Sequence, residues 1–364
     1  MSYEAVDWIA HHANYTPGKL AQIDLASGRR ATYAQMHQRI GRLAAHLSSL
    51  GVRPGDRVGF LAFNSTDILD IIFATWRVGG IALALNFRLT APEHAFIIED
   101  STPKVMFVDD DLADVGTELR NLTTVPHWIS FDGKGGDSGL EQAIENAPSR
   151  IAHMPPRLMT DQCLLMYSSG TTGKPKGVII THGMLQFAAQ NSAGPGNVSA
   201  HGVSLASMPM FHIGALNVSC MPTVVIGGTN VVMRMFDPAA ALSIISDPDL
   251  GITHVFAVPA ALNVLRQTQG AEDADFSRIV TVIAGAETVP PPLVEWWRAR
   301  GVIVQEGYGL TETAGSGCLL LKEEVAERVG SAGKAMMHSR FKIIRHDCTD
   351  APSNEPGEIC IKGA

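Results

Sequence analysis

Paired cysteines are missing from this sequence of 364 residues. Its five cysteines stand far apart and form no C-x-x-C pair (Cys163, Cys220, Cys318, Cys348 and Cys360). An odd number of scattered cysteines indicates reduced thiols, as in a cytoplasmic protein, rather than a disulfide framework.

Neither a targeting leader nor a membrane span is expected from the sequence. The segment Met1 to His12 contains two acidic residues and lacks the basic-then-apolar pattern of a leader. The longest apolar stretches are interrupted, one near Arg77 and the other at Pro222. We therefore expect no integral membrane segment.

Positive charge is scarce relative to negative charge. The chain has 28 Lys and Arg residues and 36 Asp and Glu residues, which gives a formal net charge of −8. This balance argues against a nucleic-acid binder and against a surface for anionic membranes. Any phosphate chemistry must therefore rely on local positive groups. With 46% hydrophobic residues, the chain can bury the core of an ordinary globular protein.

Helix and strand patterns alternate along the chain. Apolar residues recur at helical spacing from Thr32 to Gly51, and runs such as IALALN and KVMFVD have the composition of buried strands. Further helices are expected over 65–78, 90–99, 111–122, 237–246 and 290–300, and strands over 203–209, 229–235, 280–285 and 302–309. This alternation predicts an α/β fold with parallel sheets covered by helices.

The most distinctive stretch is LLMYSSGTTGKPKGVIITHGM, residues 164–184, in which two short apolar runs predict strands joined by a turn. The turn offers flexible glycines, hydroxyls and positive charge, which suit a polyphosphate (Ser168, Ser169, Gly170, Thr171, Thr172, Gly173, Lys174 and Lys176). It is not a Walker A loop, because only two residues separate its first two glycines and Pro175 follows Lys174. An ordinary polar turn with solvated lysines is the alternative.

Two further segments place polar residues at strand ends. His212 follows an expected strand among apolar residues, where a structural histidine is the simpler interpretation. Gly285, Ala286 and Glu287 lie where a strand turns into a loop, and a plain surface turn explains them equally well.

The segment QEGYGLTET combines an aromatic ring with a hydroxyl and a carboxylate. Small neighbours leave the Tyr308 ring free to stack on a base, while Thr311 offers a hydroxyl and Glu312 a carboxylate suited to Mg²⁺. Taken alone, an aromatic turn that starts an acid-capped helix is the simpler interpretation.

The strings SSGTTGKPKGV and QEGYGLTET, in this order, resemble motifs of the AMP-forming acyl-CoA synthetases, the superfamily that includes luciferases and peptide-synthetase adenylation domains. Weaker similarities extend the likeness from about Thr16 onward (TYAQMHQRIGRLAAHL, PGDRVGFL, LNFRLTAPE, GSAGKAM and PGEICIKG). The resemblance implies two stacked, helix-covered, mostly parallel sheets in residues 1–195 and 196–329, with the early segment free to pack on the second. It also implies the start of a small β-barrel-like subdomain in 330–364.

The resemblance also implies a role for each matching residue. The turn from Ser168 to Gly173 would bind phosphates, with Lys174 and Lys176 supplying charge, and His212 would gate the acyl tunnel. Adenine would lie against Gly285, Ala286, Glu287, Tyr308 and Gly309, Thr311 would bond the α-phosphate, and Glu312 would hold Mg²⁺. The acyl pocket would be formed by Phe211, Gly214, Ala215, Ala314 and Gly315.

In the reaction that the resemblance implies, a carboxylic acid attacks ATP to give an acyl-adenylate, and the thiolate of coenzyme A then displaces AMP. The acid is already a nucleophile, so positioning and electrostatics are the expected means of catalysis. Small residues in the expected pocket, with no fixed cation among them, favour an apolar fatty or aryl acid.

Family members continue past the position matched by Ala364, into a ribose-binding motif and a C-terminal domain with a further lysine. The resemblance therefore implies the large N-terminal part of such a ligase without that domain, and we expect poor adenylation. Two alternatives stay open, a non-catalytic nucleotide-binding module and an adenylating enzyme whose acceptor is a carrier-protein thiol. The sequence also leaves open whether the chain forms a homodimer.

Overall fold

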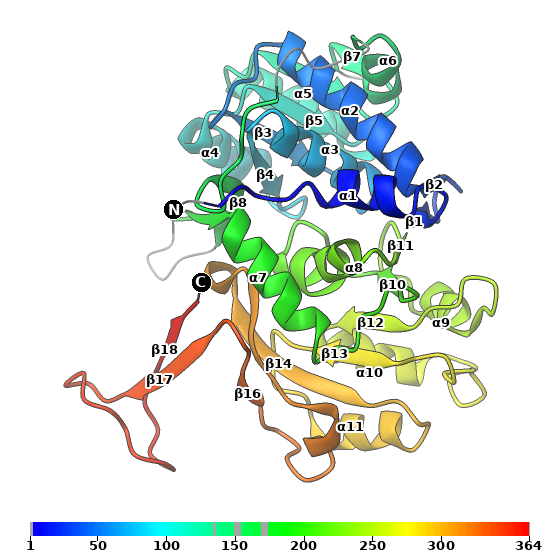
Figure 1. Cartoon of the computed structure of the whole chain (residues 1–364), viewed down its shortest axis with the longest axis vertical. Coiled ribbons are helices and arrows are strands. Elements are labelled where there is room, and N and C mark those ends of the chain that lie inside the picture. The colour runs from blue at the N-terminus through cyan, green and yellow to red at the C-terminus, as the bar shows by residue number, and fades with distance from the viewer. Residues whose placement is uncertain (1–2, 134–135, 149–153, 169–173, 364) are drawn as a thin grey trace.

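The computed structural model describes residues 3–133, 136–148, 154–168 and 174–363. Within these residues two large sheets lie one above the other, with helices on their faces and between them (Figure 1). The expected fold class, two stacked and mostly parallel helix-covered sheets, is confirmed.

The first sheet has seven strands among the described residues. Six of them run parallel, and the last pair, β8 and β9, is antiparallel. In spatial order the strands are β7 (Ser138–Gly139), β6 (His127–Ser130), β5 (Val105–Val108), β3 (Arg57–Leu61), β4 (Ile81–Leu85), β8 (Gln162–Ser168) and β9 (Lys176–Thr181).

The second sheet has nine strands in the described part of the chain. Its centre is parallel, and antiparallel strands close both edges. The order is β16 (Lys334–Ala335), β15 (Gly315–Leu319), β14 (Val304–Leu310), β13 (Thr281–Ala284), β12 (His254–Ala257), β10 (Val203–Ala206), β11 (Thr229–Val232), β1 (Leu20–Asp24) and β2 (Arg30–Thr32). Because β1 pairs with β11, an early part of the chain completes the later sheet.

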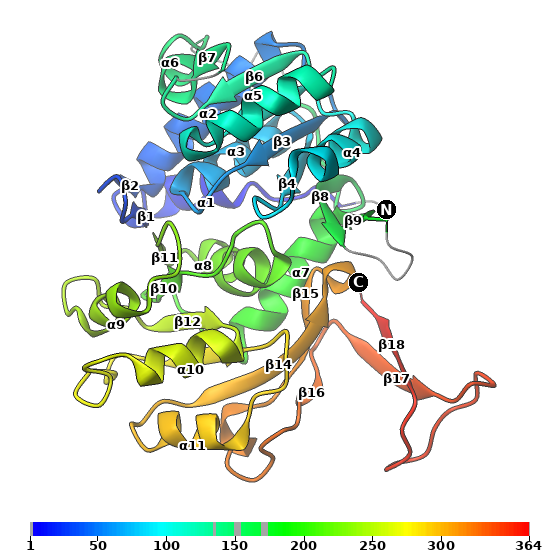
Figure 2. The ribbon, with the colours of Figure 1, turned by 180° about the vertical axis from the view of Figure 1, so that it is seen from behind.

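Helices cover both faces of each sheet. The first sheet packs on one side against α2 (Tyr33–Ser49) and α3 (Thr66–Arg77), and on the other against α4 (Ala91–Ser101) and α5 (Ala113–Leu122). The second packs on its outer side against α9 (Pro238–Ser246), α10 (Pro259–Gln267) and α11 (Pro291–Arg298). Between the sheets lie α1 (Trp8–Tyr15), α7 (His182–Ala193) and α8 (Met221–Ile226), as Figures 1 and 2 show. The short helical elements are α6 (Leu140–Glu145), η1 (Asp110–Leu112), η3 (Thr311–Thr313) and η4 (Lys322–Glu324).

Local sequence signals set several of these boundaries. Thr32 and Gln35 form a reciprocal capping box at the start of α2, which has its apolar residues on one buried face. Ser65 accepts a hydrogen bond from the Asp67 backbone and begins α3, as the sequence predicted. Asp237 caps α9 in the same way.

Two sequence-based expectations need correction. The strands expected over 203–209 and 229–235 are shorter, and between them the chain forms the π-helix η2 (Gly214–Cys220), which continues into α8. The apolar run there has no polar face, so its period did not distinguish a buried helix from a strand. The strand over 302–309 was expected to enter a loop, but β14 continues to Leu310 and returns through η3 into β15.

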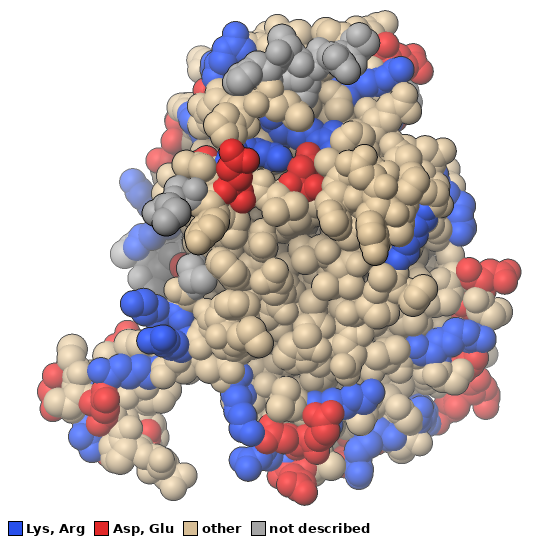
Figure 3. Space-filling model, viewed as in Figure 1, with Lys and Arg blue, Asp and Glu red and all other residues tan. Residues whose placement is uncertain are grey.

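The last strands, β17 (Arg340–Ile344) and β18 (Glu358–Lys362), form a two-stranded hairpin that projects from the body of the molecule (Figures 1 and 2). On the face drawn in Figure 3, basic and acidic side chains are interspersed and no continuous basic patch forms. No helix in the described part of the chain is long and apolar enough to cross a bilayer.

Candidate active site

A cavity of about 540 Å³ opens where parallel strands of the second sheet end. Met208 and Pro209 follow β10, Val258 follows β12, and Gly285 follows β13. In open α/β sheets, ligands bind beyond the carboxyl ends of the strands. The volume is that of a small-molecule site.

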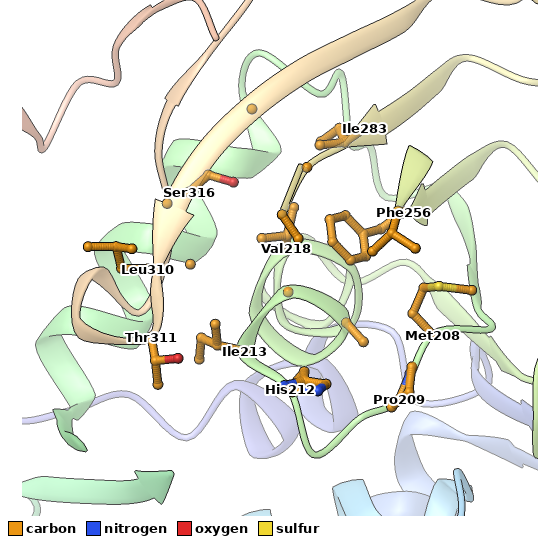
Figure 4. Close-up of a pocket in the computed structure, with 18 of the residues that line it drawn as sticks. Met208, Pro209, His212, Ile213, Val218, Phe256, Ile283, Leu310, Thr311 and Ser316 are labelled. Atoms are coloured by element: carbon orange, nitrogen blue, oxygen red, sulfur yellow. The ribbon is translucent and has the colours of Figure 1, made fainter. Parts of the chain in front are cut away.

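The inner wall of the cavity is apolar. Phe256 projects into it between Val218 and Ile283, with Met208 on one side, as Figure 4 shows. Gly214 permits this arrangement, because a Cβ there would lie 2.8 Å from the edge of the Phe256 ring. The side chains that end the cavity therefore come from η2, β12 and β13.

Polar groups gather on the rim. Ser168 comes from the end of β8, Arg88 from the loop after β4, and His212 from the segment before η2. Thr311 and Glu312 belong to η3, which contacts β9, and they also line the cavity. The two sheets together thus surround one apolar space with hydroxyls, a cation, an imidazole and a carboxylate.

His212 sits at the mouth of the cavity with its ring against Phe211, their centroids 4.3 Å apart. Burial of part of the ring, and then the positive charge of Arg88, lower the pKa of His212. The imidazole is therefore neutral at pH 7 and can donate or accept a hydrogen bond, but carries no charge to attract an anion.

The hairpin of β8 and β9 confirms the two strands predicted around the phosphate turn. Ser168 and Lys176 are paired in register at the end where the two strands are connected, and Lys174 and Lys176 are exposed. No ion pair joins either lysine to another described residue. The remaining predicted phosphate ligands lie outside the described residues (Ser169, Gly170, Thr171, Thr172 and Gly173).

The predicted adenine residues separate into two groups. Gly285, Ala286 and Gly309 line the cavity, whereas Glu287 lines a smaller recess of about 350 Å³ beside α10. Tyr308 does not line the cavity, although Gly307 and Gly309 on either side of it do, and the pairing of β14 with β15 is irregular between Tyr308 and Gly309. Its ring meets Phe341 edge-on at 6.5 Å.

Gly309 has no room for a side chain. A Cβ at this position would lie 1.9 Å from the Gly315 carbonyl oxygen on the paired strand β15. The close approach of these two glycines brings the η3 turn, with Thr311 and Glu312, back over the cavity.

The predicted acyl-pocket residues also divide. Gly214, Ala215 and Gly315 line the cavity, whereas Phe211 and Ala314 are buried behind it. The Phe211 ring packs edge-on against Phe87, and the Ala314 carbonyl accepts a hydrogen bond from the Asn217 side chain.

The comparison with protein families gives one match over most of the chain. The profile described as AMP-binding enzyme covers residues 9–364. The chain belongs to this family.

Several AMP-binding enzymes resemble the chain closely. It is 33% identical to a feruloyl-CoA synthase from Amycolatopsis sp. over 92% of this chain and 65% of that protein. It is 32% identical to an indoleacetate–CoA ligase from Aromatoleum aromaticum over 99% of this chain and 70% of that one. The chain thus spans about two thirds of the length of these relatives.

Solved structures of the family show the same architecture. The inhibitor-bound N-terminal domain of FACL13 from Mycobacterium tuberculosis aligns with a TM-score of 0.91 at 32% identity. The alignment covers 99% of this chain and 89% of that one. The O-succinylbenzoate coenzyme A synthetase from Bacillus subtilis, in complex with ATP and magnesium, aligns with a TM-score of 0.86 at 28% identity, covering 100% of this chain and 71% of that one.

Two charged residues near the cavity were not predicted from the sequence. Arg88 lines the cavity, and its guanidinium lies 5.7 Å from the ring centre of Phe87 and 5.9 Å from that of Phe211. This corrects the expectation that no fixed cation stands at the pocket. The segment LNFRLTAPE drew attention only as a family likeness, because its arginine follows a buried strand with no motif of its own.

Glu306 is the second missed residue. It is only 7% exposed at the end of the parallel part of β14, and its Oε2 has no hydrogen-bond partner in the described residues. Burial raises the pKa of Glu306, although a backbone hydrogen bond from Val289 opposes the shift. Gly307, the next residue, lines the cavity, but Glu306 does not, and its unpaired oxygen is buried within the protein.

Proposed function

We propose that this chain carries the ATP and acid sites of an AMP-forming acyl-CoA ligase, which converts a carboxylic acid to its acyl-adenylate and then to its coenzyme A thioester. The observation that carries the proposal is one cavity with an apolar inner wall and a rim that joins the lysine hairpin to Thr311 and Glu312. Relatives named as CoA synthases and ligases support coenzyme A as the acceptor.

The acid would place its apolar part against Phe256, Val218 and Ile283, with its carboxylate at the rim. There a neutral His212 can donate a hydrogen bond without forming an ion pair that would hold the carboxylate too firmly to react. The acid needs no general base, because its carboxylate is already the nucleophile. Positioning of the two anionic reactants is then the main task of the site.

The triphosphate of ATP would lie at the hairpin. Lys174 and Lys176 are exposed on it and are not neutralised by described carboxylates, so they can screen the charge that develops on pyrophosphate. Thr311 lines the cavity on η3, which contacts β9 of the hairpin, and would offer its hydroxyl to the α-phosphate. Attack by the carboxylate oxygen forms the acyl–phosphate bond, and the bond to the leaving pyrophosphate breaks.

The residues at the rim fit a magnesium ion held jointly with phosphates. Glu312 is exposed at the cavity, and the described residues contain no cluster of three or more ligating His, Cys, Asp or Glu side chains. Mg²⁺ commonly binds through one or two carboxylates together with substrate phosphates. When bound, it would neutralise charge on the phosphates.

Adenine would lie between the loop after β13 and the glycines of β14. Gly307 and Gly309 have no side chains, so their backbone faces the cavity and leaves room for a flat base. Stacking by Tyr308 remains a prediction, because its ring lies outside the cavity lining.

The proposed acid is apolar, either fatty or aryl. The inner wall of the cavity supports this class, and the relatives include a feruloyl-CoA synthase and a long-chain-fatty-acid–CoA ligase of Mycobacterium tuberculosis. Because Arg88 lies at the mouth, the site could also accept an acid with a second polar group at that end.

The proposal is tested by calorimetric titration of the chain with Mg·ATP and by ATP–pyrophosphate exchange with ferulate, indoleacetate and decanoate. We expect Mg·ATP binding and acid-dependent exchange. Nucleotide binding without exchange for any acid would favour a non-catalytic nucleotide-binding module. Exchange followed by transfer of the acyl group to a carrier-protein thiol, but not to coenzyme A, would favour an adenylating enzyme whose acceptor is a carrier protein.

Removing either hairpin lysine should weaken ATP binding. Lys174→Ala and Lys176→Ala each delete a charge-assisted hydrogen bond to phosphate, and we expect the Kd for Mg·ATP to rise about tenfold or more. The measurement is calorimetric titration. Lys362→Ala, which removes an exposed lysine of β18, is the matched control and should leave the Kd unchanged. Equal affinity in all these variants would contradict the placement of the triphosphate.

Shortening the inner wall should change the choice of acid. Phe256→Ala removes the ring that projects between Val218 and Ile283, so the preference should move toward longer acids by about tenfold in the ratio of Kd values for decanoate and hexanoate. Phe187→Ala removes a ring of α7 outside the cavity lining and serves as the control. An unchanged ratio would show that the acid binds elsewhere.

A further inference from the structure

The cavity wall between β10 and η2 has little regular structure to hold it. Met208, Pro209 and His212 line the cavity from this segment, which belongs to neither a strand nor a helix. Within the segment, one backbone hydrogen bond, from His212 to the Pro209 carbonyl at 3.1 Å, closes a turn. Something outside the segment must therefore fix its position relative to the inner wall.

Asn64 supplies that support from the other sheet. It follows β3 of the first sheet and is 4% exposed. Its Nδ2 donates to the Met208 carbonyl at 2.9 Å and to the Met233 carbonyl at 3.1 Å. Its Oδ1 accepts from the Met210 backbone at 2.8 Å. One amide thus satisfies groups on two loops of the second sheet.

These hydrogen bonds are buried and have no substitute. Met210 is fully buried, and no other described side chain hydrogen-bonds to the backbone of residues 208–210. A buried carbonyl or N–H that loses its partner carries the full cost of its desolvation. Without the Asn64 amide, the segment would have to move to reach water or another partner, and the cavity wall would move with it.

We propose that Asn64 is a positioning residue for the acid site, which holds the Met208–His212 wall against the apolar inner wall although it touches no substrate itself. The proposal rests on the proposed function in that this wall is taken to contact the acid. Among the described residues of the hairpin and η3, the parts of the rim assigned to ATP, none forms a hydrogen bond with Asn64. Its loss should therefore affect the acid far more than the nucleotide.

Other links keep the two sheets together when Asn64 is changed. Arg234, after β11, forms a bidentate ion pair with Asp109, after β5, at 2.7 and 3.0 Å. Asp24, at the end of β1, accepts hydrogen bonds from the Thr66 backbone at 3.0 Å and the Ser65 hydroxyl at 3.1 Å. Neither link includes residues 208–212. Removing the Asn64 side chain should therefore release this segment while the two sheets stay packed together.

The test uses Asn64→Ala in the whole chain, with Ser65→Ala as the matched control. Ser65 is the next residue and lies at the same junction, but has no contact with the wall. For Asn64→Ala we expect the Kd for decanoate to rise about tenfold and that for Mg·ATP to change less than about twofold. Ser65→Ala should leave both ligands bound as in the wild type. Amide hydrogen exchange should become faster at Met210 in Asn64→Ala alone.

Three results would overturn the proposal. They are an unchanged decanoate Kd in Asn64→Ala, equal losses for decanoate and Mg·ATP, and exchange at Met210 that is no faster than in Ser65→Ala. If the wild type binds neither decanoate nor Mg·ATP, the proposed function fails. The exchange rate at Met210 then decides by itself whether Asn64 fixes the segment.

Discussion

Replacing Glu312 by glutamine should weaken binding of ATP about a hundredfold in the presence of magnesium and much less in its absence. Glu312 is the carboxylate that η3 brings over the cavity beside Thr311. Glutamine keeps the size and one oxygen of the side chain but removes the charge that a hard divalent cation requires. Losing an interaction with a charged group costs about 1.5–3 kcal/mol, which is about ten- to a hundredfold in affinity. Calorimetric titration with ATP at several magnesium concentrations measures the effect.

Glu327→Gln is the matched control, since Glu327 is exposed and lies outside the cavity lining. It should leave both the affinity and its magnesium dependence as in the wild type. A Glu312→Gln variant whose magnesium dependence equals that of the wild type would remove Glu312 from the metal site, whatever its affinity for ATP.

The second large effect concerns stability. Arg39→Met should lower the free energy of unfolding by about 3–5 kcal/mol, because breaking a buried ion pair leaves the Asp70 carboxylate with only the more distant Arg29, at 3.9 Å, as a counter-charge. Arg39, on α2, bonds Asp70 at 2.7 Å, Asp67 at 2.7 Å and Glu141 at 2.6 Å. The Asp70 side chain is fully buried on α3, and Gln22 donates to it at 3.1 Å. Urea titration gives the difference in stability.

The loss of stability in Arg39→Met should depend on pH through the ionisation of Asp70. Burial raises the pKa of Asp70 to about 6, while Arg39 and Arg29 lower it. A carboxyl with a raised pKa in the folded state disfavours folding as the pH rises through that value. Without Arg39 the pKa should rise further, so the deficit should be larger at pH 7.5 than at pH 5.

Arg298→Met is the control for the loss of an ion pair. Arg298 and Glu295 on α11 are both half exposed, and such surface pairs contribute about 0–1 kcal/mol. If Arg39→Met were no more destabilising than Arg298→Met, the ion pairs between α2, α3 and α6 would not stabilise the first sheet.

Local patterns predicted the elements whose boundaries depend on neighbours in sequence. The apolar runs around the hairpin gave β8 and β9, and Ser65 gave the start of α3, because a cap and an alternating run act within a few residues. The motifs also placed Thr311 and Glu312 on one turn, where the structure has them. The apolar run that forms η2 and α8 has no regularly spaced polar residues, so its pattern did not predict these helices.

The sequence by itself determined the alternation of strands and helices, the hairpin lysines and the family to which the chain belongs, because each is written in adjacent residues. The tertiary structure alone decided that Arg88 faces the cavity and that Asn64 supports its wall. Their partners lie far along the chain, Asn64 and Met208 being on different sheets. Such contacts depend on how the two sheets stack, which no local spacing encodes.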